Sequence, residues 1–350
     1  MNDKPLPRTP VKTGRRQTLL GVLALAASLL IPQTTFASGN ANLSTNETEG
    51  RVLNVSFKNN GIDMAGNLYL PKNFSKTGKY PVIVSVHPGG GVKEQTAGLY
   101  AQKLAEQGYV TLAFDASHQG ASGGMPRFLD DPMRRVADVY SAIDYLTTLS
   151  YVDANRIGVL GICAGGGIAI KASMLDRRIK SVATVSGIDV GAATRRGWDG
   201  KAPASNLIAM LESVAKQRSA EAAGAEPAYV PYVPNVGDTT APRDLQEAAD
   251  YYLTPRGQHP NTPNKMLMIS LSNLAAFSGF DGAETLLTQP LLVVAGNQAG
   301  SLWQSQELYA KAAGPKELSI IDGATHMDLY DGKGANTATN KLLPFFARTL

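Results

Sequence analysis

Apolar and polar positions follow two repeating patterns along the chain. Residues 51–57 alternate apolar and polar side chains, and a second predicted strand at 64–70 follows the turn residues Asn59-Asn60-Gly61. This arrangement predicts a β-hairpin, because an Asn-Gly pair favours the tight turn that joins antiparallel strands. Later runs are mainly apolar and predict buried strands. These runs cover residues 81–86, 109–114, 156–160, 181–185, 291–295 and 318–321.

Helical periodicity lies between the buried strands. Residues 133–149 place Val136, Ile143 and Leu146 on one face of a predicted helix. Further helices are predicted at 95–107, 168–172, 205–219, 301–313 and 337–349. A hairpin followed by repeated strand-helix units predicts an α/β fold, with a mostly parallel eight-stranded sheet and helices on both faces.

The strand-helix rhythm breaks between residues 188 and 285. We therefore expect a core made of residues 51–187 and 286–350, with residues 188–285 inserted as a cap over the sheet. Four tyrosines of this cap could shape a substrate site or pack in the cap's own core. They are Tyr229, Tyr232, Tyr251 and Tyr252.

The first 50 residues do not follow either pattern. Arg15-Arg16 precedes an apolar run from Leu19 to Ile31, and Thr35-Phe36-Ala37 provides small residues for signal peptidase. Residues 1–37 are thus predicted to be a twin-arginine export signal, followed by a linker at 38–50. A permanent N-terminal anchor is the alternative. Export predicts a periplasmic or secreted protein without stable membrane insertion after signal cleavage.

The net positive charge of the chain disappears once this predicted signal is removed. The whole chain carries 33 basic and 29 acidic residues. Residues 1–37 hold five of the basic residues and one of the acidic ones, which leaves 28 of each. The positive charge therefore belongs to the signal, and no nucleic-acid partner is implied. The oligomeric state is not encoded in any pattern of the sequence.

The most informative stretch is Gly161-Ile162-Cys163-Ala164-Gly165, which follows a predicted strand and precedes a predicted helix. A nucleophile between two such glycines has the form of a nucleophile elbow, with Cys in the place of Ser. Cys163 is the only cysteine in the chain, so no disulfide can form within it. The alternative is a buried, inert cysteine in a degenerate elbow.

Taken together, these parts resemble the α/β-hydrolases, and most closely the dienelactone-hydrolase-like branch with its Gly-x-Cys-x-Gly elbow. The resemblance covers about residues 50–350. Within it, the segments 289–296 and 323–331 look like those of a bacterial subgroup of largely uncharacterised hydrolases. The subgroup is also similar to fungal polyketide transferases.

The resemblance implies a role for each of four residues. Cys163 would be the nucleophile, and the partial positive charge at the start of the following helix would lower its pKa. His326, after the last strand, would be the general base and later the acid. The amides of Ala164 and Gly90 would form the oxyanion hole, with Gly89 and Gly91 as alternatives to Gly90.

The other histidines fit catalysis less well. His87 would be structural, His118 could line the pocket, and His259 would lie on the surface of the cap. Asp115 heads the loop 115–124 and is interpreted as a structural residue that binds loop amides.

The third member of the triad is where the chain departs from the family. The usual acid position, a few residues after the seventh strand, is occupied by Ala299. Asn297 or Gln298 could orient His326 as a neutral amide. Three acidic residues remain as substitutes that the sequence does not separate: Asp281, Glu307 and Asp328.

These observations favour a hydrolase that cleaves a carboxylic ester, lactone or thioester through an acyl-enzyme. An acyltransferase with the same Cys–His pair is one alternative, and a non-catalytic binding protein on a decayed hydrolase fold is another. No phosphate-binding loop or metal-ligand spacing is present, so neither a cofactor nor a metal is expected. The substrate would be a small molecule.

Overall fold

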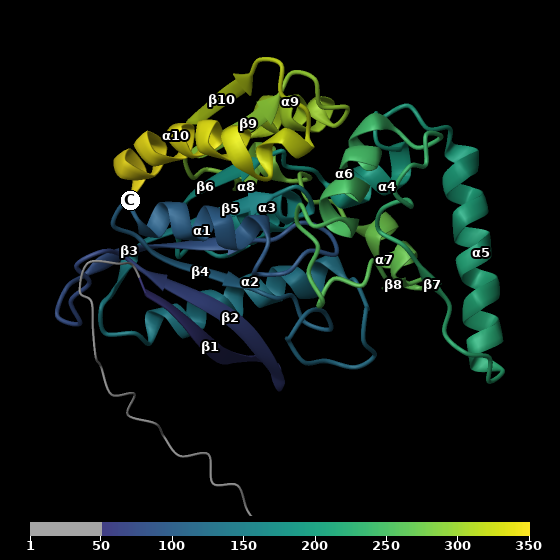
Figure 1. Ribbon diagram of the computed structural model, residues 1–350, viewed down its shortest axis with the longest axis horizontal. Coiled ribbons are helices and arrows are strands. Elements are labelled where there is room, and N and C mark those ends of the chain that lie inside the picture. The colour runs from purple at the N-terminus through teal and green to yellow at the C-terminus, as the bar shows by residue number, and fades with distance from the viewer. Residues whose placement is uncertain (1–50) are drawn as a thin grey trace, which may run out of the picture. The chain divides into compact units, whose positions relative to one another are not determined.

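The computed structural model describes residues 51–350, which lie in one compact unit. The predicted export signal and linker fall outside the described residues. Eight of the described strands form one sheet in the order β1-β2-β4-β3-β5-β6-β9-β10 (Figure 1). Their bounds are β1 Arg51–Asn59, β2 Ile62–Leu70, β3 Tyr80–Val86, β4 Val110–Phe114, β5 Val152–Ile162, β6 Ile179–Val185, β9 Leu291–Gly296 and β10 Lys316–Ile321.

Strand pairing follows the expected plan. β1 pairs antiparallel with β2, and β2 pairs antiparallel with β4. The remaining neighbours, from β4 across to β10, are parallel. The prediction of a mostly parallel eight-stranded sheet is therefore confirmed. Because parallel strands end at the same edge, the loops after β3, β5, β6 and β9 are brought together there.

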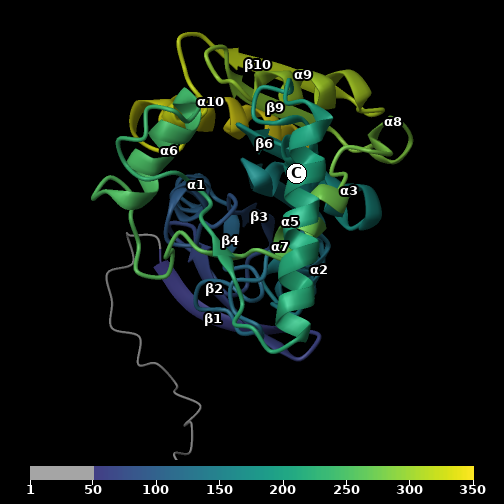
Figure 2. The same ribbon diagram turned by 90° about the vertical axis from the view of Figure 1, so that its right-hand side faces the viewer.

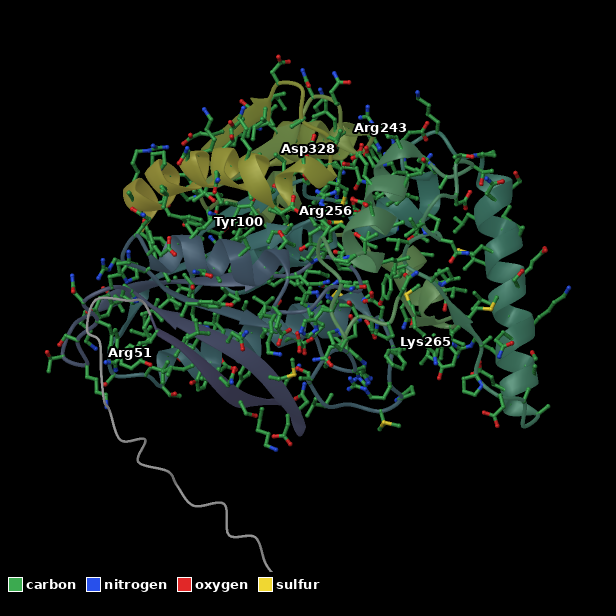
Figure 3. All side chains as sticks on the ribbon, viewed as in Figure 1. Arg51, Tyr100, Arg243, Arg256, Lys265 and Asp328 are labelled. Carbon is green, nitrogen blue, oxygen red and sulfur yellow. The ribbon has the colours of Figure 1, made fainter. Side chains whose placement is uncertain are left out.

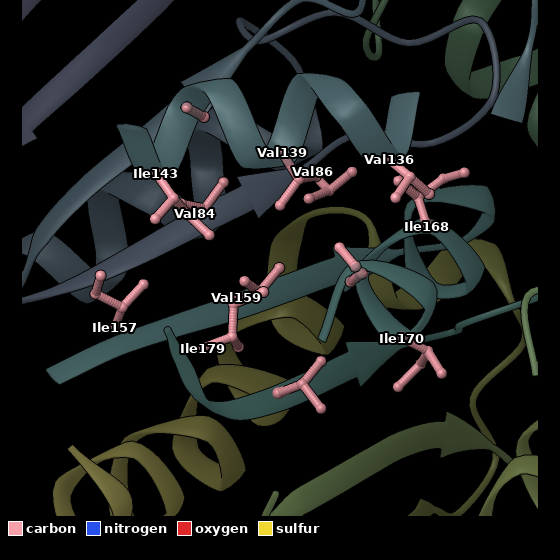
Figure 4. Packing of buried hydrophobic residues seen from close by; sticks show 14 of the residues in the cluster. Val84, Val86, Val136, Val139, Ile143, Ile157, Val159, Ile168, Ile170 and Ile179 are labelled. Atoms are coloured by element: carbon pink, nitrogen blue, oxygen red, sulfur yellow. The ribbon is translucent and has the colours of Figure 1, made fainter. Parts of the chain in front are cut away.

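Helices cover both faces of the sheet. α1 (Thr96–Ala105) and α10 (Gly332–Thr349) contact each other on one face. α2 (Pro132–Thr147), α3 (Ala164–Leu175), α8 (Ala283–Leu286) and α9 (Leu302–Lys311) form a contiguous series on the other. Figure 4 shows Val136, Val139 and Ile143 of α2 packed over the sheet, and all three are buried. Burial of such a side chain contributes about 1.5 to 3 kcal/mol.

The segment 188–285, called the cap below, lies at the carboxyl end of the parallel strands (Figures 1 and 2). It contains α4 (Val190–Arg196), α5 (Ala204–Ala222), α6 (Arg243–Leu253), α7 (Ser270–Ala276) and the short strands β7 (Tyr229–Val230) and β8 (Met266–Leu267). The 3-10 helix η1 (Met327–Leu329) follows β10 in the core. No helix within residues 51–350 is long and apolar enough to cross a membrane.

The start of α3 differs from the sequence-based prediction. The helix begins at Ala164, directly after Cys163, rather than near residue 168. The sequence predicts a later start because residues 165–167 are three consecutive glycines, and glycine has a low helix propensity. Close packing against neighbouring backbone explains why they are there.

Candidate active site

The nucleophile elbow has the strained geometry that its sequence predicts. Cys163 joins β5 to α3 with φ 52° and ψ −123°, a conformation that costs a non-glycine residue about 1 to 3 kcal/mol. A Cβ on Gly161 would lie 2.3 Å from the Gly165 carbonyl oxygen. A Cβ on Gly165 would lie 2.2 Å from the Val86 carbonyl oxygen. Both glycines are thus required for strand, turn and helix to approach one another.

Replacing Gly165 with alanine should lower the free energy of unfolding by about 3 kcal/mol, because the new methyl group would collide with the backbone of β3. Denaturation in urea, followed by circular dichroism, measures this change. Gly123→Ala is the matched control, since a Cβ there would have no neighbour closer than 3.4 Å. Equal losses in both variants would contradict the steric explanation.

Two backbone amides face the thiol of Cys163. They belong to Ala164, at the start of α3, and to Gly89, in the loop after β3. A Cβ on Gly89 would lie 3.7 Å from the Ala164 Cβ, whereas a Cβ on Gly90 would meet the Tyr232 ring at 2.6 Å. Gly90 therefore faces the cap, and the oxyanion-hole prediction moves from Gly90 to its neighbour Gly89.

A buried arginine holds the loop that carries Gly89. Arg135 of α2 is 4% exposed and donates to the carbonyl oxygens of His87 and Pro88. His87 accepts a hydrogen bond from the Ala116 amide at 3.1 Å. Burial, followed by the charge of Arg135, lowers the pKa of His87 to about 3, so this histidine is neutral. The interpretation of His87 as structural agrees with these contacts.

The protonation state of the thiol differs from the expectation. Burial raises the pKa of Cys163, and the Tyr330 hydroxyl, the Ala164 amide, Arg135 and the Gly89 amide offset this only in part. The prediction that the helix start would lower this pKa overall was wrong, because desolvation of the thiolate outweighs the favourable dipoles. Cys163 is thus a neutral thiol near pH 7.

His326 lies in the loop between β10 and η1 and is 1% exposed. Its backbone carbonyl accepts a hydrogen bond from Ser186 Oγ at 2.9 Å, and its Nδ1 lies 2.7 Å from Ser301 Oγ. Burial lowers the pKa of His326 to about 4, although the charge of Asp244 raises it. The imidazole is therefore neutral near pH 7 and available as a base.

Tyr330 lies between the thiol and the imidazole. Its hydroxyl is 3.5 Å from His326 Nε2, and it also forms a hydrogen bond with the Cys163 side chain. Tyr100 of α1 fixes the same loop by donating to the Leu329 carbonyl oxygen at 2.6 Å. Nε2, the Tyr330 hydroxyl and the thiol are thus the groups that meet at the elbow.

None of the five side chains considered for the triad's third position is the Nδ1 partner of His326. The amide of Asn297 accepts from the Gly323 amide, and Gln298 is exposed. Each of the three carboxylates has other partners. Asp281 pairs with Lys311, Glu307 pairs with Arg196 and Lys311, and Asp328 accepts from the Thr325 amide.

Ser301 and Asp244 are not among the site residues predicted from the sequence. Ser301 lies directly after the glycine that follows Ala299, and it is the residue beside Nδ1. Asp244 is the second residue of α6 in the cap and is 3% exposed. Its Oδ2 accepts hydrogen bonds from the Gly300 amide at 2.7 Å and from Trp198 Nε1 at 2.8 Å. Ser301 could have been predicted as a site residue because it lies close to the usual position of the acid. No local sequence signal could have identified Asp244.

A cavity of about 320 Å³ opens onto these groups. Cys163, Gly89, Ala164 and His326 line it together. Most of the remaining lining is apolar and comes from the cap, for example Ala248, Met266 and Leu274. Its size and lining suit a small, mainly apolar molecule.

The cap tyrosines divide between the two roles that the sequence left open. Tyr232 and Tyr252 line the cavity, and the Tyr232 hydroxyl donates to Asp130 Oδ2 at 2.9 Å. Tyr251 packs edge-on against Tyr330, with ring centroids 5.2 Å apart. Tyr229 is exposed and stacks on Lys265.

Two histidines and one carboxylate outside the cavity are explained by their contacts. His118 Nδ1 lies 3.0 Å from the Pro126 carbonyl oxygen, and His259 Nδ1 accepts from the Asn261 amide. Neither histidine lines the cavity. Asp115 accepts from the amides of Lys93 and Ala121 at 2.8 Å, as the structural interpretation expected.

The sheet topology, the elbow and the late histidine loop define an α/β-hydrolase. The chain belongs to the dienelactone hydrolase family, and the family's sequence profile matches residues 64–222. As expected, this chain resembles uncharacterised bacterial proteins. It is 45% identical over 301 residues to the uncharacterised protein YcjY of Escherichia coli K12, covering 85% of this chain and 98% of YcjY.

Similarity extends to a solved structure and to a fungal enzyme. The crystal structure of hypothetical protein PA2218 from Pseudomonas aeruginosa matches with a TM-score of 0.81 and 35% identity, over 89% of this chain and 100% of that one. Polyketide transferase claH of Penicillium crustosum is 23% identical over 297 residues, which are 83% of this chain and 94% of claH. Family and fold support a hydrolase or acyltransferase with a small-molecule substrate.

Proposed function

We propose that this protein hydrolyses a carboxylic ester, lactone or thioester through an acyl-enzyme on Cys163. One observation carries the proposal: the only thiol of the chain stands at a strained elbow, facing two backbone amides, in a cavity that also contains a neutral, buried histidine. Strain at a residue outside the regular elements is typical of functional positions.

The first half of the reaction uses the neutral Cys–His pair. With the Nδ1 proton donated to Ser301 Oγ, Nε2 of His326 can accept the thiol proton. The sulfur then forms a bond to the substrate carbonyl carbon, and the carbonyl electron pair moves to oxygen. The amides of Ala164 and Gly89 donate to this oxyanion. Collapse of the intermediate breaks the bond to the leaving group, which takes the proton from His326.

The second half repeats these steps with water. His326 removes a proton from water, the hydroxide attacks the thioester carbon, and the Cys163 sulfur leaves and is reprotonated by the imidazolium. An oxyanion forms again at the same amides. The free acid is released and the thiol is restored.

Mass spectrometry of the intact protein tests this proposal. A brief reaction with an activated short-chain ester should add one acyl group, and this group should be on Cys163. Iodoacetamide should compete for the same sulfur. Because the chain has a single cysteine, alkylation reports on this residue alone. Turnover without an acyl adduct and without sensitivity to iodoacetamide would contradict the mechanism.

Acyl transfer is the second candidate, supported by the similarity to polyketide transferase claH. The same thioester would pass its acyl group to an alcohol or amine instead of water. Product that forms only when such an acceptor is added distinguishes the two. The non-catalytic alternative depended on Ala299, and the contacts of Ser301 and Asp244 weaken that reason. Export to the periplasm or beyond remains a proposal from the sequence of residues 1–37.

A further inference from the structure

We propose that Asp244 of the cap positions His326 and supplies the negative charge that the residue at 299 cannot supply. The catalytic site would then be complete only while the cap is seated on the core. The kinetic consequence rests on the proposed Cys163–His326 chemistry. The link between Asp244 and the imidazole can be tested without any turnover.

A short chain of contacts connects the carboxylate to the imidazole. Asp244 Oδ2 holds the Gly300 amide at 2.7 Å, the next residue is Ser301, and Ser301 Oγ lies 2.7 Å from His326 Nδ1. Trp198 forms a second connection, because its Nε1 donates to the same carboxylate oxygen and its ring lies edge-on to His326, with centroids 4.9 Å apart. Asp244 thus fixes both the hydrogen-bonding partner of the imidazole and a ring that packs on it.

The charge of Asp244 also acts on the imidazole directly. Burial lowers the pKa of His326, and Asp244 is the charge that raises it. Three further titratable groups line the cavity with His326, and burial raises the pKa of each: Cys163 at the elbow, Tyr330 after η1 and Tyr252 of α6. All three are therefore neutral near pH 7. When His326 takes the thiol proton, the carboxylate stabilises the imidazolium that forms.

The helix that carries Asp244 contacts both loops of the histidine. Arg243 begins α6, lies 4.0 Å from Asp244 Oδ1 and donates to the Gln298 carbonyl oxygen. Figure 3 labels Arg243 together with Arg256. Arg256 follows α6, donates to the Met327 carbonyl oxygen at 3.3 Å and pairs with Asp331 at 2.9 Å. α6 is thus joined to the loop of Ser301 at one end and to the loop of His326 at the other.

The isosteric variant Asp244→Asn separates charge from packing. An amide oxygen can accept both hydrogen bonds that Oδ2 accepts now, so the loop contacts can persist while the charge is lost. Glu247→Gln is the matched control, because it removes the same charge one turn further along α6, where the carboxylate pairs with Arg243 at 3.5 Å.

The first measurement is an NMR titration of His326 in the wild type and both variants. Asp244→Asn should lower the pKa of His326 below its wild-type value, since the charge that raises it is gone, whereas Glu247→Gln should leave it nearly unchanged. The second is the pH profile of kcat/KM. Its acid limb should move to lower pH in Asp244→Asn, and kcat should fall by about tenfold to a hundredfold with little change in KM.

Each outcome decides one question. An unchanged His326 pKa and an unchanged kcat in a folded Asp244→Asn protein would overturn the role of Asp244. If that variant does not fold, Ser301→Ala breaks the last contact alone and should lower kcat, and an unaffected kcat would overturn the role as well. Absence of turnover in the wild type would instead contradict the proposed function, and the titration would still decide for or against Asp244.

Discussion

Replacing Cys163 with alanine is expected to lower kcat/KM for an activated short-chain ester by on the order of 10⁴-fold or more. Without the sulfur no acyl-enzyme can form, and only binding and the amides of Ala164 and Gly89 remain. The loss should be in kcat, because the cavity that binds the acyl group is lined mainly by other residues. Steady-state kinetics with a panel of acyl chain lengths measures this.

Cys163→Ser is the informative comparison. It keeps a nucleophile of similar size at the same elbow, but a hydroxyl is harder to ionise than a thiol. Its rate should therefore lie between those of the wild type and the alanine variant. Equal turnover of the wild type and Cys163→Ala across the panel would rule out the catalytic role of this thiol.

His326→Gln is expected to lower kcat/KM by about 10² to 10⁴-fold, the usual contribution of a positioned base. The loss should be large because burial raises the pKa of the Cys163 thiol, which then depends on the imidazole for its ionisation. The wild-type rate should be lost as the pH falls through about 4, because protonation of His326 removes the base. This acid limb should be absent from the residual activity of the variant.

His259→Gln is the matched control for that experiment. His259 is a half-buried cap residue whose Nδ1 accepts the Asn261 amide, and it does not line the cavity. Its replacement should leave both the rate and the acid limb unchanged. An acid limb that persists unaltered in His326→Gln would show that another group is the base.

Much of this architecture could be predicted because its signals are local. Buried strands such as β3 and β9 are continuous apolar runs, and the hairpin turn requires Asn-Gly at its corner. The elbow is equally local, since Gly161 and Gly165 flank Cys163 within five residues and a Cβ on either would lie 2.3 Å or less from a backbone oxygen. Parallel strand order then predicts that the loops of Cys163 and His326 meet at one edge.

Two sequence-based predictions were wrong. One depended on contacts with residues that are distant in sequence, and the other on whether burial raises or lowers a pKa. The sequence does not show which of the two adjacent glycines, Gly89 or Gly90, faces the thiol. The positions of Ala164 and Tyr232 in the folded protein show that it is Gly89. The thiol pKa was expected to fall because a helix start is visible in sequence, whereas the burial that raises it is a property of the packed site.

The sequence by itself determined the sheet, the elbow and the place of Cys163 in it, because each depends on residues a few positions apart whose sterics or periodicity are fixed locally. Only the tertiary structure decided which groups surround His326. Asp244 is separated from it by more than half of α6, the rest of the cap and two strands of the core, and no spacing rule relates the two. Folding brings the carboxylate to the 300–301 loop because the cap closes over the carboxyl edge of the sheet, where a buried charge is satisfied by the Gly300 amide and Trp198.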